Sequence, residues 1–215
     1  MNKLLVGECI RAGWEIFKKR PVMIIGAFVL AIVISGIASS LLEPAEGAPV
    51  TVSTVAMGIA SAIIGLFVEI GLVTFSIRAH DSAESVTLKD LWNPQPFLYY
   101  LAGQILVGIA VIVGLILLIV PGIIIALTLL FTSYIIIDKH RGPIEAIKES
   151  IRITKGHRWE LLLLVVTIIG LNILGLLALV VGLLVTIPVS MLALVHAYRK
   201  LEREAPTMSS PAASY

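Results

Sequence analysis

Four long apolar blocks alternate with charged segments along the chain and predict its transmembrane helices. An apolar helix crosses a hydrocarbon core of roughly 30 Å with about 20 residues. Two blocks fit one crossing each, and the other two are long enough for two crossings and too long for one. The pattern predicts an all-helical transmembrane bundle of six helices in three hairpins, over residues 22–42, 52–77, 97–119, 122–138, 160–180 and 183–198.

Turn residues mark where the two long blocks fold back. Val120, Pro121 and Gly122 predict the first turn, because proline interrupts a helix and glycine accepts the left-handed conformation of a helix end. In the second block, Gly175 and Gly182 are the candidate turn residues.

Each predicted hairpin follows a segment whose polar and apolar residues alternate with helical spacing. These segments, residues 3–19, 87–93 and 143–155, predict amphipathic helices at the cytoplasmic membrane surface. Thr87 and Asp90 have the spacing of a capping box that opens one short turn. Pro143 is placed at a first helical position, and Gly156 is expected to end the third segment.

The basic residues predict the orientation of the chain. All 16 Lys and Arg residues fall before the first predicted helix, between the second and third, between the fourth and fifth, or after the sixth. The positive-inside rule then places both termini in the cytoplasm. We expect a multi-pass protein of a prokaryotic cytoplasmic membrane, with one transmembrane domain over residues 1–203 and a disordered tail over 204–215.

A cleaved secretory signal is the competing interpretation of the N-terminus, with residues 22–37 as its apolar region. The basic segment before these residues is long and has the pattern of a helix, which favours a retained first crossing.

Composition supports the membrane assignment. The 215 residues are 58% hydrophobic and only 14% charged, which excludes an ordinary water-soluble globule. The net charge of +2 is too small to indicate a nucleic-acid partner, so membrane lipids are the expected surroundings. The single cysteine, Cys9, excludes an intramolecular disulfide and a cysteine-based zinc cluster.

Candidate catalytic groups are sparse, so we expect no enzyme activity, no cofactor and no bound metal. Asp138 is interpreted as a solvated helix end rather than as an acid catalyst. Four histidines have no pair at metal-ligand spacing and are interpreted as surface residues: His80, His140, His157 and His196.

Four polar residues at predicted membrane depth form a candidate intramembrane site: Glu69, Gln104, Tyr134 and Asn172. Glu69 is the one formally charged residue well inside an apolar block, and a charge near mid-membrane costs roughly 2.5 to 3.5 kcal/mol. We therefore expect Glu69 to face the bundle interior or to be protonated, with Gln104 as its best partner and Tyr134 next. Two roles are open for Glu69. It would either form a hydrogen bond between helices, or exchange a proton or cation in a small carrier.

Basic residues of the amphipathic segments form a candidate collar for anionic lipid or a partner protein. Each such residue near an anionic surface contributes about 1 kcal/mol. The alternative is that these segments only anchor the hairpins. The candidate lipid contacts are Arg11, Lys18, Lys19, Arg20, Lys148, Arg152, Lys155 and Arg158.

A stretch in the C-terminal half resembles a group of prokaryotic six-helix membrane proteins. It runs from Val120-Pro121-Gly122 through Tyr134, Ala146, Ser150 and Gly156 to Trp159. The group includes the YciC-like proteins and the membrane domain found beside some glycerophosphoryl diester phosphodiesterases. The resemblance implies an inner-membrane protein without an assigned reaction. Phosphodiesterase activity is not expected, because the sequence has no soluble block large enough for that catalytic barrel.

The function predicted from these features is non-catalytic: an interaction or membrane-organising subunit that binds a protein partner or anionic lipid, alone or as a homo-oligomer. A small transporter or proton-coupled carrier using the Glu69 region is the second hypothesis.

Overall fold

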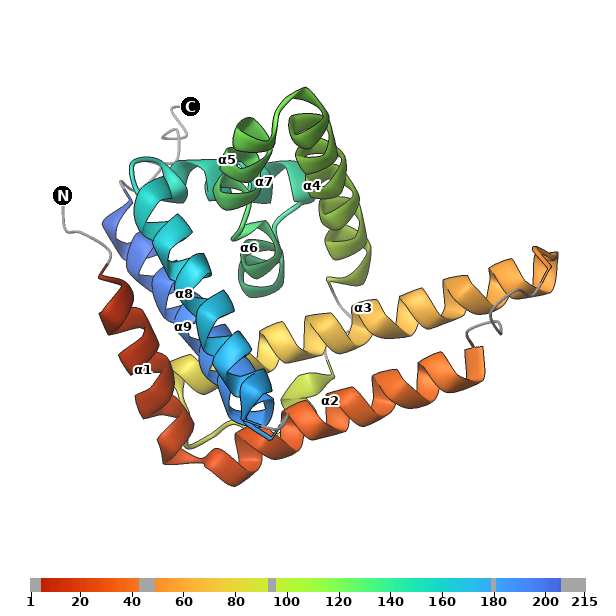
Figure 1. Cartoon of the computed structure of the whole chain (residues 1–215), viewed down its shortest axis with the longest axis horizontal. Coiled ribbons are helices and arrows are strands. Elements are labelled where there is room, and N and C mark those ends of the chain that lie inside the picture. Colours follow the sequence, from red (N-terminus) through yellow and green to blue (C-terminus); the bar gives the residue numbers. More distant parts are fainter. Residues whose placement is uncertain (1–4, 43–48, 93–95, 179–180, 206–215) are drawn as a thin grey trace, which may run out of the picture.

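The computed structural model describes residues 5–42, 49–92, 96–178 and 181–205 (Figure 1). Within this part of the chain, six helical stretches are long and apolar enough to cross a membrane, which confirms the predicted fold class and the number of candidate crossings. The helices are α1 (Val6–Lys19), α2 (Pro21–Leu42), α3 (Val52–Asp81), the 3-10 turn η1 (Leu88–Leu91), α4 (Phe97–Leu117), α5 (Ile119–Thr128), α6 (Thr132–Lys139), α7 (Pro143–Thr154), α8 (Arg158–Leu177) and α9 (Leu183–Glu204).

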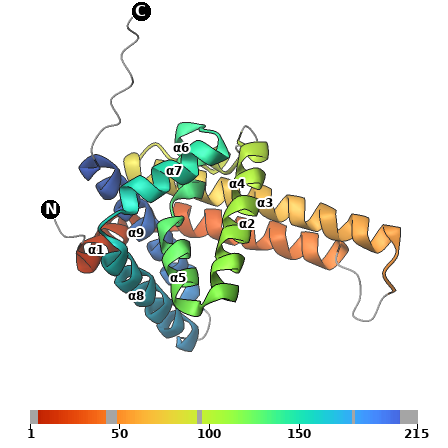
Figure 2. The same cartoon turned by 90° about the horizontal axis from the view of Figure 1, so that it is seen from above.

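The long helices form three hairpins, α2–α3, α4–α5 and α8–α9, that diverge from a shared base. Figures 1 and 2 both show the α2–α3 hairpin extending away from the other two. The six helices therefore do not lie side by side as one parallel bundle.

The core lies where the hairpins meet. One buried cluster joins α1 and α3 to α9 around Tyr100, Phe131 and Tyr198. A second joins α1, α2, α3 and α9 around Phe17 and Phe75. Away from this base the helices keep large apolar side chains exposed, as membrane-spanning segments do toward lipid.

The predicted amphipathic helix over 3–19 is observed as α1, and its apolar face packs along α9. At Gly13 the two backbones almost touch, because a Cβ atom there would lie 2.6 Å from the carbonyl oxygen of Val189. Lys200 Nζ bonds Glu8 Oε2 at 2.6 Å and fixes the other end of the contact. Residues 1–4 lie outside the described chain.

The fourth predicted crossing, 122–138, is wrong as one continuous helix. The chain leaves helical geometry after Thr128 and resumes it at Thr132, which divides the segment into α5 and α6. The freed carbonyl of Thr128 accepts hydrogen bonds from the hydroxyls of Ser150 at 2.8 Å and Thr154 at 3.2 Å, both on α7. A buried break in a helix is tolerated where side chains satisfy its backbone in this way.

The turn between α4 and α5 also differs from the prediction. It lies at Leu118, which is extended, and Pro121 occupies the first turn of α5, where no helical bond is lost. Gly122 is not a left-handed helix end. A Cβ atom added to Gly114 would lie 3.0 Å from the Cα atom of Gly122, so the two glycines let α4 and α5 approach closely.

The α8–α9 hairpin repeats this construction with Gly175 and Gly182. A Cβ atom on Gly182 would lie 2.8 Å from Gly175 Cα, so both predicted residues serve close packing near the turn. Residues 179 and 180 of the turn, which the sequence assigns to the fifth crossing, lie outside the described chain.

Local signals at the shorter elements are confirmed. Thr87 and Asp90 form the predicted capping box of η1, and Pro143 is the first residue of α7. Gly156 adopts a left-handed φ of 91° just after α7, as a helix-ending glycine does. Helix α9 continues to Glu204, beyond the predicted end at 198, and residues 206–215 of the predicted tail lie outside the described chain.

Candidate functional site

Glu69 and Gln104 meet where α3 contacts α4, which confirms their predicted pairing. Gln104 Nε2 donates to Glu69 Oε1 at 3.2 Å and to the Tyr100 hydroxyl at 3.0 Å. Tyr100 is buried, and its hydroxyl also interacts with Glu69. The pair is therefore part of a small polar cluster at the seam between two hairpins.

The prediction that Glu69 faces the bundle interior is wrong, whereas its depth in the membrane stays a prediction. Gly71, two residues further along α3, touches the carbonyl oxygen of Leu91 in η1, and Phe67 stacks on Trp92 with ring centroids 5.9 Å apart. Glu69 therefore lies close to η1 along α3. Its side chain is exposed rather than enclosed by helices.

Tyr134 and Asn172 pack mainly against other residues, although Tyr134 also interacts electrostatically with Glu69. Tyr134 is buried in an aromatic cluster, with its ring centroid 6.0 Å from that of Tyr198. Asn172 Nδ2 donates to Ser190 Oγ at 3.2 Å and joins α8 to α9. The four residues predicted as one site are thus one bonded pair and two residues with other contacts.

An ion-pair cluster around Arg199 joins α3, α6 and α9. The guanidinium bonds Asp81 at 2.5 Å and Asp138 at 2.7 Å, and the Tyr198 hydroxyl donates to Asp138 at 2.9 Å. The interpretation of Asp138 as a solvated helix end is wrong, because its side chain is 15% exposed and holds two partners. The cluster fixes the ends of these helices relative to one another.

A second ion-pair cluster centres on Glu149 of α7, whose side chain is 4% exposed. Its carboxylate bonds Arg152 Nη2 at 2.6 Å and Lys139 Nζ at 3.3 Å. The hydrogen bond from Arg152 is the main cause that holds the pKa of the Glu149 carboxyl below its ordinary value. Arg152 is thus engaged within the protein, and its role as a lipid contact stays a prediction.

The interpretation of all four histidines as surface residues is also wrong. His80 Nε2 lies 3.1 Å from His196 Nδ1, so these two rings bond between α3 and α9. His157 is buried and bonds Glu160 at 2.6 Å. His140 is exposed, as the sequence indicates.

An apolar groove with a basic mouth lies between α5 and the junction of α7 with α8. It has a volume of about 740 Å³. Lys155, Arg158 and Trp159 stand at the mouth, all exposed, and the sequence had already identified both basic residues as lipid contacts. The apolar wall of the groove was not predicted from the sequence. The helical spacing of apolar residues along α5 is the signal that indicates this wall. The wall consists of Val120, Ile123, Ile124, Leu127 and Leu162.

The other predicted lipid contacts form no continuous collar. Arg11 pairs with Glu15 at 3.0 Å, and Lys18 Nζ lies 6.0 Å from the centre of the Trp14 ring. Arg20 donates to two backbone carbonyls of the loop before η1. Lys19 and Lys148 are exposed. The basic residues thus divide into one group at the end of α1 and another at the α7–α8 junction.

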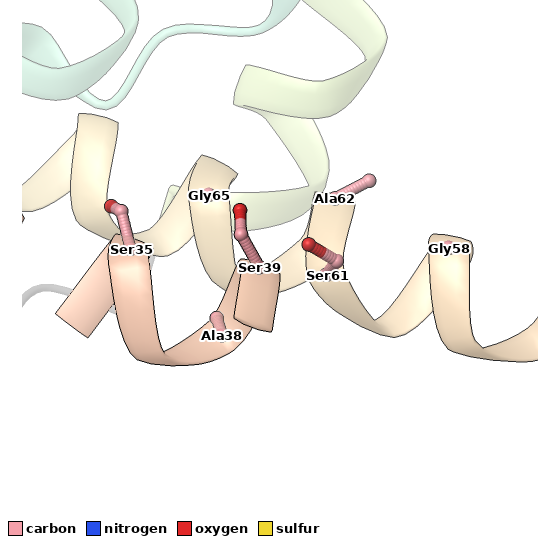
Figure 3. A pocket seen from close by; sticks show the side chains of 7 residues that line it. All are labelled: Ser35, Ala38, Ser39, Gly58, Ser61, Ala62 and Gly65. Carbon is pink, nitrogen blue, oxygen red and sulfur yellow. The ribbon is translucent and has the colours of Figure 1, made fainter. Parts of the chain in front are cut away.

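A hollow of about 400 Å³ separates α2 from α3 further along their hairpin (Figure 3). Figure 3 shows the side chain of Ser61 on α3 pointing toward Ser39 of α2, with Ser35 one helical turn away on α2. Its lining also includes Ala38, Gly58, Ala62 and Gly65. Small residues of this kind let membrane helices approach closely, so we assign this hollow to helix packing.

Comparison with known proteins finds a matching family for the C-terminal half of the chain. Residues 98–205, which run from α4 to the residue after α9, match the family model described as "Protein of unknown function (DUF975)". No curated protein and no solved structure matches the chain. The matched segment includes every residue of the groove between α5 and α8, whereas Glu69 lies outside it. The chain belongs to the DUF975 family of membrane proteins.

Proposed function

We propose that this protein acts without catalysis, by binding an anionic phospholipid in the groove between α5 and α8. The observation that carries the proposal is the pairing of Lys155 and Arg158 at the mouth of an apolar groove. The proposal includes a prokaryotic cytoplasmic membrane as its location, with both termini in the cytoplasm.

We infer an amphiphilic ligand because the groove has both an apolar wall and basic residues. Its apolar wall suits an acyl chain, and two cations at one end suit a phosphate. At about 1 kcal/mol for each cation, the pair favours an anionic over a neutral headgroup by about 2 kcal/mol, or roughly 30-fold in affinity. Trp159, 76% exposed, has the position of an interfacial anchor. The first turn of α8 adds the partial positive charge of a helix start.

The resemblance noted from the sequence supports the choice of this groove. Val120, Gly156 and Trp159 carry part of the resemblance to the YciC-like proteins and the phosphodiesterase-associated membrane domain, and all three line the groove. We extend the resemblance to a shared lipid-contacting surface in that group. Organising anionic lipid around the three hairpins is then the role of the chain.

Lipid titration of the purified full-length chain, followed by native mass spectrometry, tests the proposal. We expect phosphatidylglycerol to bind more tightly than phosphatidylcholine. Replacing Lys155 and Arg158 together by Gln should weaken phosphatidylglycerol binding by roughly 30-fold. The matched control is Lys148→Gln, because Lys148 is an exposed cation of α7 that does not line the groove.

Equal affinity for the two lipids, or undiminished phosphatidylglycerol binding by the double variant, would overturn the proposal. A protein that copurifies in fixed ratio and is lost from the double variant, while lipid binding is retained, would instead establish a protein-binding role.

A proton-coupled carrier remains the second candidate, favoured by the hydrogen bond between Glu69 and Gln104 at the α3–α4 seam. Transport by proteoliposomes that Glu69→Gln abolishes would support it. The groove variants would leave that transport intact if the two functions were separate.

A further inference from the structure

A second groove with a basic mouth runs along α2, outside the segment that matches the family. We propose that it binds a second anionic phospholipid, so that each chain holds two. This inference shares the ligand chemistry of the proposed function but rests on different residues, so either site can fail without the other.

The headgroup end of this site is a hollow of about 580 Å³ at the start of α2. Lys19 and Arg20 line it, together with the exposed Val22 and with Gly26. Arg20 Nη1 is held by the carbonyl oxygens of Glu84 at 2.7 Å and Val86 at 3.2 Å, which fixes the guanidinium in place. A guanidinium has five N–H donors, so it can bind these carbonyls and a phosphate at the same time.

The acyl-chain end is an apolar groove of about 320 Å³ that continues from the first hollow. Leu30, Ala31 and Ile34 of α2 line one side, and Phe67 of α3 lines the other. Leu88 of η1 lines both hollows, so the two lie next to each other.

The register of α2 explains why the two hollows form one channel. Residues 22, 26, 30 and 34 are spaced by four and therefore follow one stripe of the helix. Twelve residues along a helix extend about 18 Å, a length suited to an acyl chain. Gly26 lies on this stripe between the headgroup end and the acyl-chain end, and it leaves open the space that a side chain would fill.

Charge and aromatic residues favour a lipid as the occupant. The two cations that line the headgroup end, Lys19 and Arg20, match an anionic headgroup. Trp92 lines the acyl-chain part and is 73% exposed, a state close to that of Trp159 at the first groove. Both grooves thus combine two basic residues, an exposed tryptophan and an apolar helical stripe.

Gly26→Leu is the decisive variant, because it fills the channel without disturbing the protein. A Cβ atom at Gly26 would meet no atom within 4 Å, so the added side chain enters the channel rather than a packed contact. Gly36→Leu is the matched control on the same helix, since its Cβ also meets no atom within 4 Å and Gly36 lines neither hollow.

The number of phosphatidylglycerol molecules bound to the purified full-length chain, counted by native mass spectrometry, tests the inference. We expect two on the wild type and on Gly36→Leu, and one on Gly26→Leu. Replacing Lys19 alone by Gln should weaken one of the two binding steps about fivefold.

Two tightly bound lipids on Gly26→Leu, or phosphatidylcholine bound there as well as phosphatidylglycerol, would overturn the inference. The variant that lacks Lys155 and Arg158 separates the two sites. If it still binds two lipids while Gly26→Leu binds one fewer than the wild type, the proposed function fails and the second site stands.

Discussion

The contact between α1 and α9 at Gly13 provides a sharp test of the fold. In a Gly13→Leu variant the new Cβ would lie 2.6 Å from the carbonyl oxygen of Val189 and 3.0 Å from the amide nitrogen of Ala193. Both atoms belong to the backbone and cannot rotate away, so α1 must shift or detach from α9. Gly7→Leu is the matched control, because a Cβ at Gly7 meets no atom within 4 Å.

The expected cost follows from overpacking and helix propensity. Forcing extra atoms into a packed contact costs typically 1 to 3 kcal/mol, and a rigid backbone contact belongs at the upper end. Replacing glycine within a helix returns about 1 kcal/mol. The net destabilisation of the α1–α9 contact is about 2 kcal/mol, or roughly a 30-fold larger population of detached α1.

Cys9 reports this detachment, because it is the single cysteine of the chain and is fully buried on the same helix. The rate of maleimide labelling follows the detached population when α1 opens and closes faster than it is labelled. We expect Gly13→Leu to be labelled roughly 30-fold faster than the wild type, and Gly7→Leu no faster. Equal labelling of Gly13→Leu and the wild type would refute the close backbone contact.

The same thiol predicts a pH dependence with a defined sign. Burial raises the pKa of Cys9 to about 11, from an ordinary value of 9.0. The contribution of the protonated thiol to the α1–α9 contact is therefore complete below pH 9 and is lost as the pH rises toward 11. Detachment of α1 can be monitored by the fluorescence of a probe that is attached to the end of α1 without using a cysteine. We expect detachment to increase over that pH window in the wild type, and a Cys9→Ala variant should lack this step.

Further predictions concern topology, charge and the ends of the chain. Reporter fusions at Ser85 and Pro143 should both lie in the cytoplasm, and finding them on opposite sides would exclude the six-crossing topology. Glu149→Gln should destabilise the protein by about 1 to 3 kcal/mol in thermal unfolding, because Lys139 and Arg152 lose a shared buried partner. In the wild type that contribution should be complete above the ordinary Glu pKa of 4.5 and should be lost as the pH falls from there through the lower folded-state pKa. If Glu69 only bonds between helices, Glu69→Gln should leave stability and lipid binding unchanged; a selective loss of transport would contradict that role. A chain truncated after Glu204, where α9 ends, should still insert and accumulate in the membrane, and its absence from the membrane would indicate a docked tail.

The sequence by itself determined which segments are helical and which can cross a membrane. These properties depend on the length of an apolar run and on the spacing of polar residues, both of which are local. The capping box at Thr87 and the helix end at Gly156 are local for the same reason. The pairing of Glu69 with Gln104 could also be predicted, because neighbouring helices of one topology bring residues of similar depth together.

Tertiary structure decided how the helices are broken, how they diverge and where the charges go. The break after Thr128 depends on two hydroxyls of α7, and the bond between His80 and His196 joins residues 116 positions apart. The surroundings of Glu69 depend on η1 folding back onto Gly71. Both grooves likewise need walls from separate helices. The one-dimensional pattern assigns each residue to a face of its own helix, but only packing selects the partner of that face and decides whether a cation meets a carboxylate or stays available to lipid.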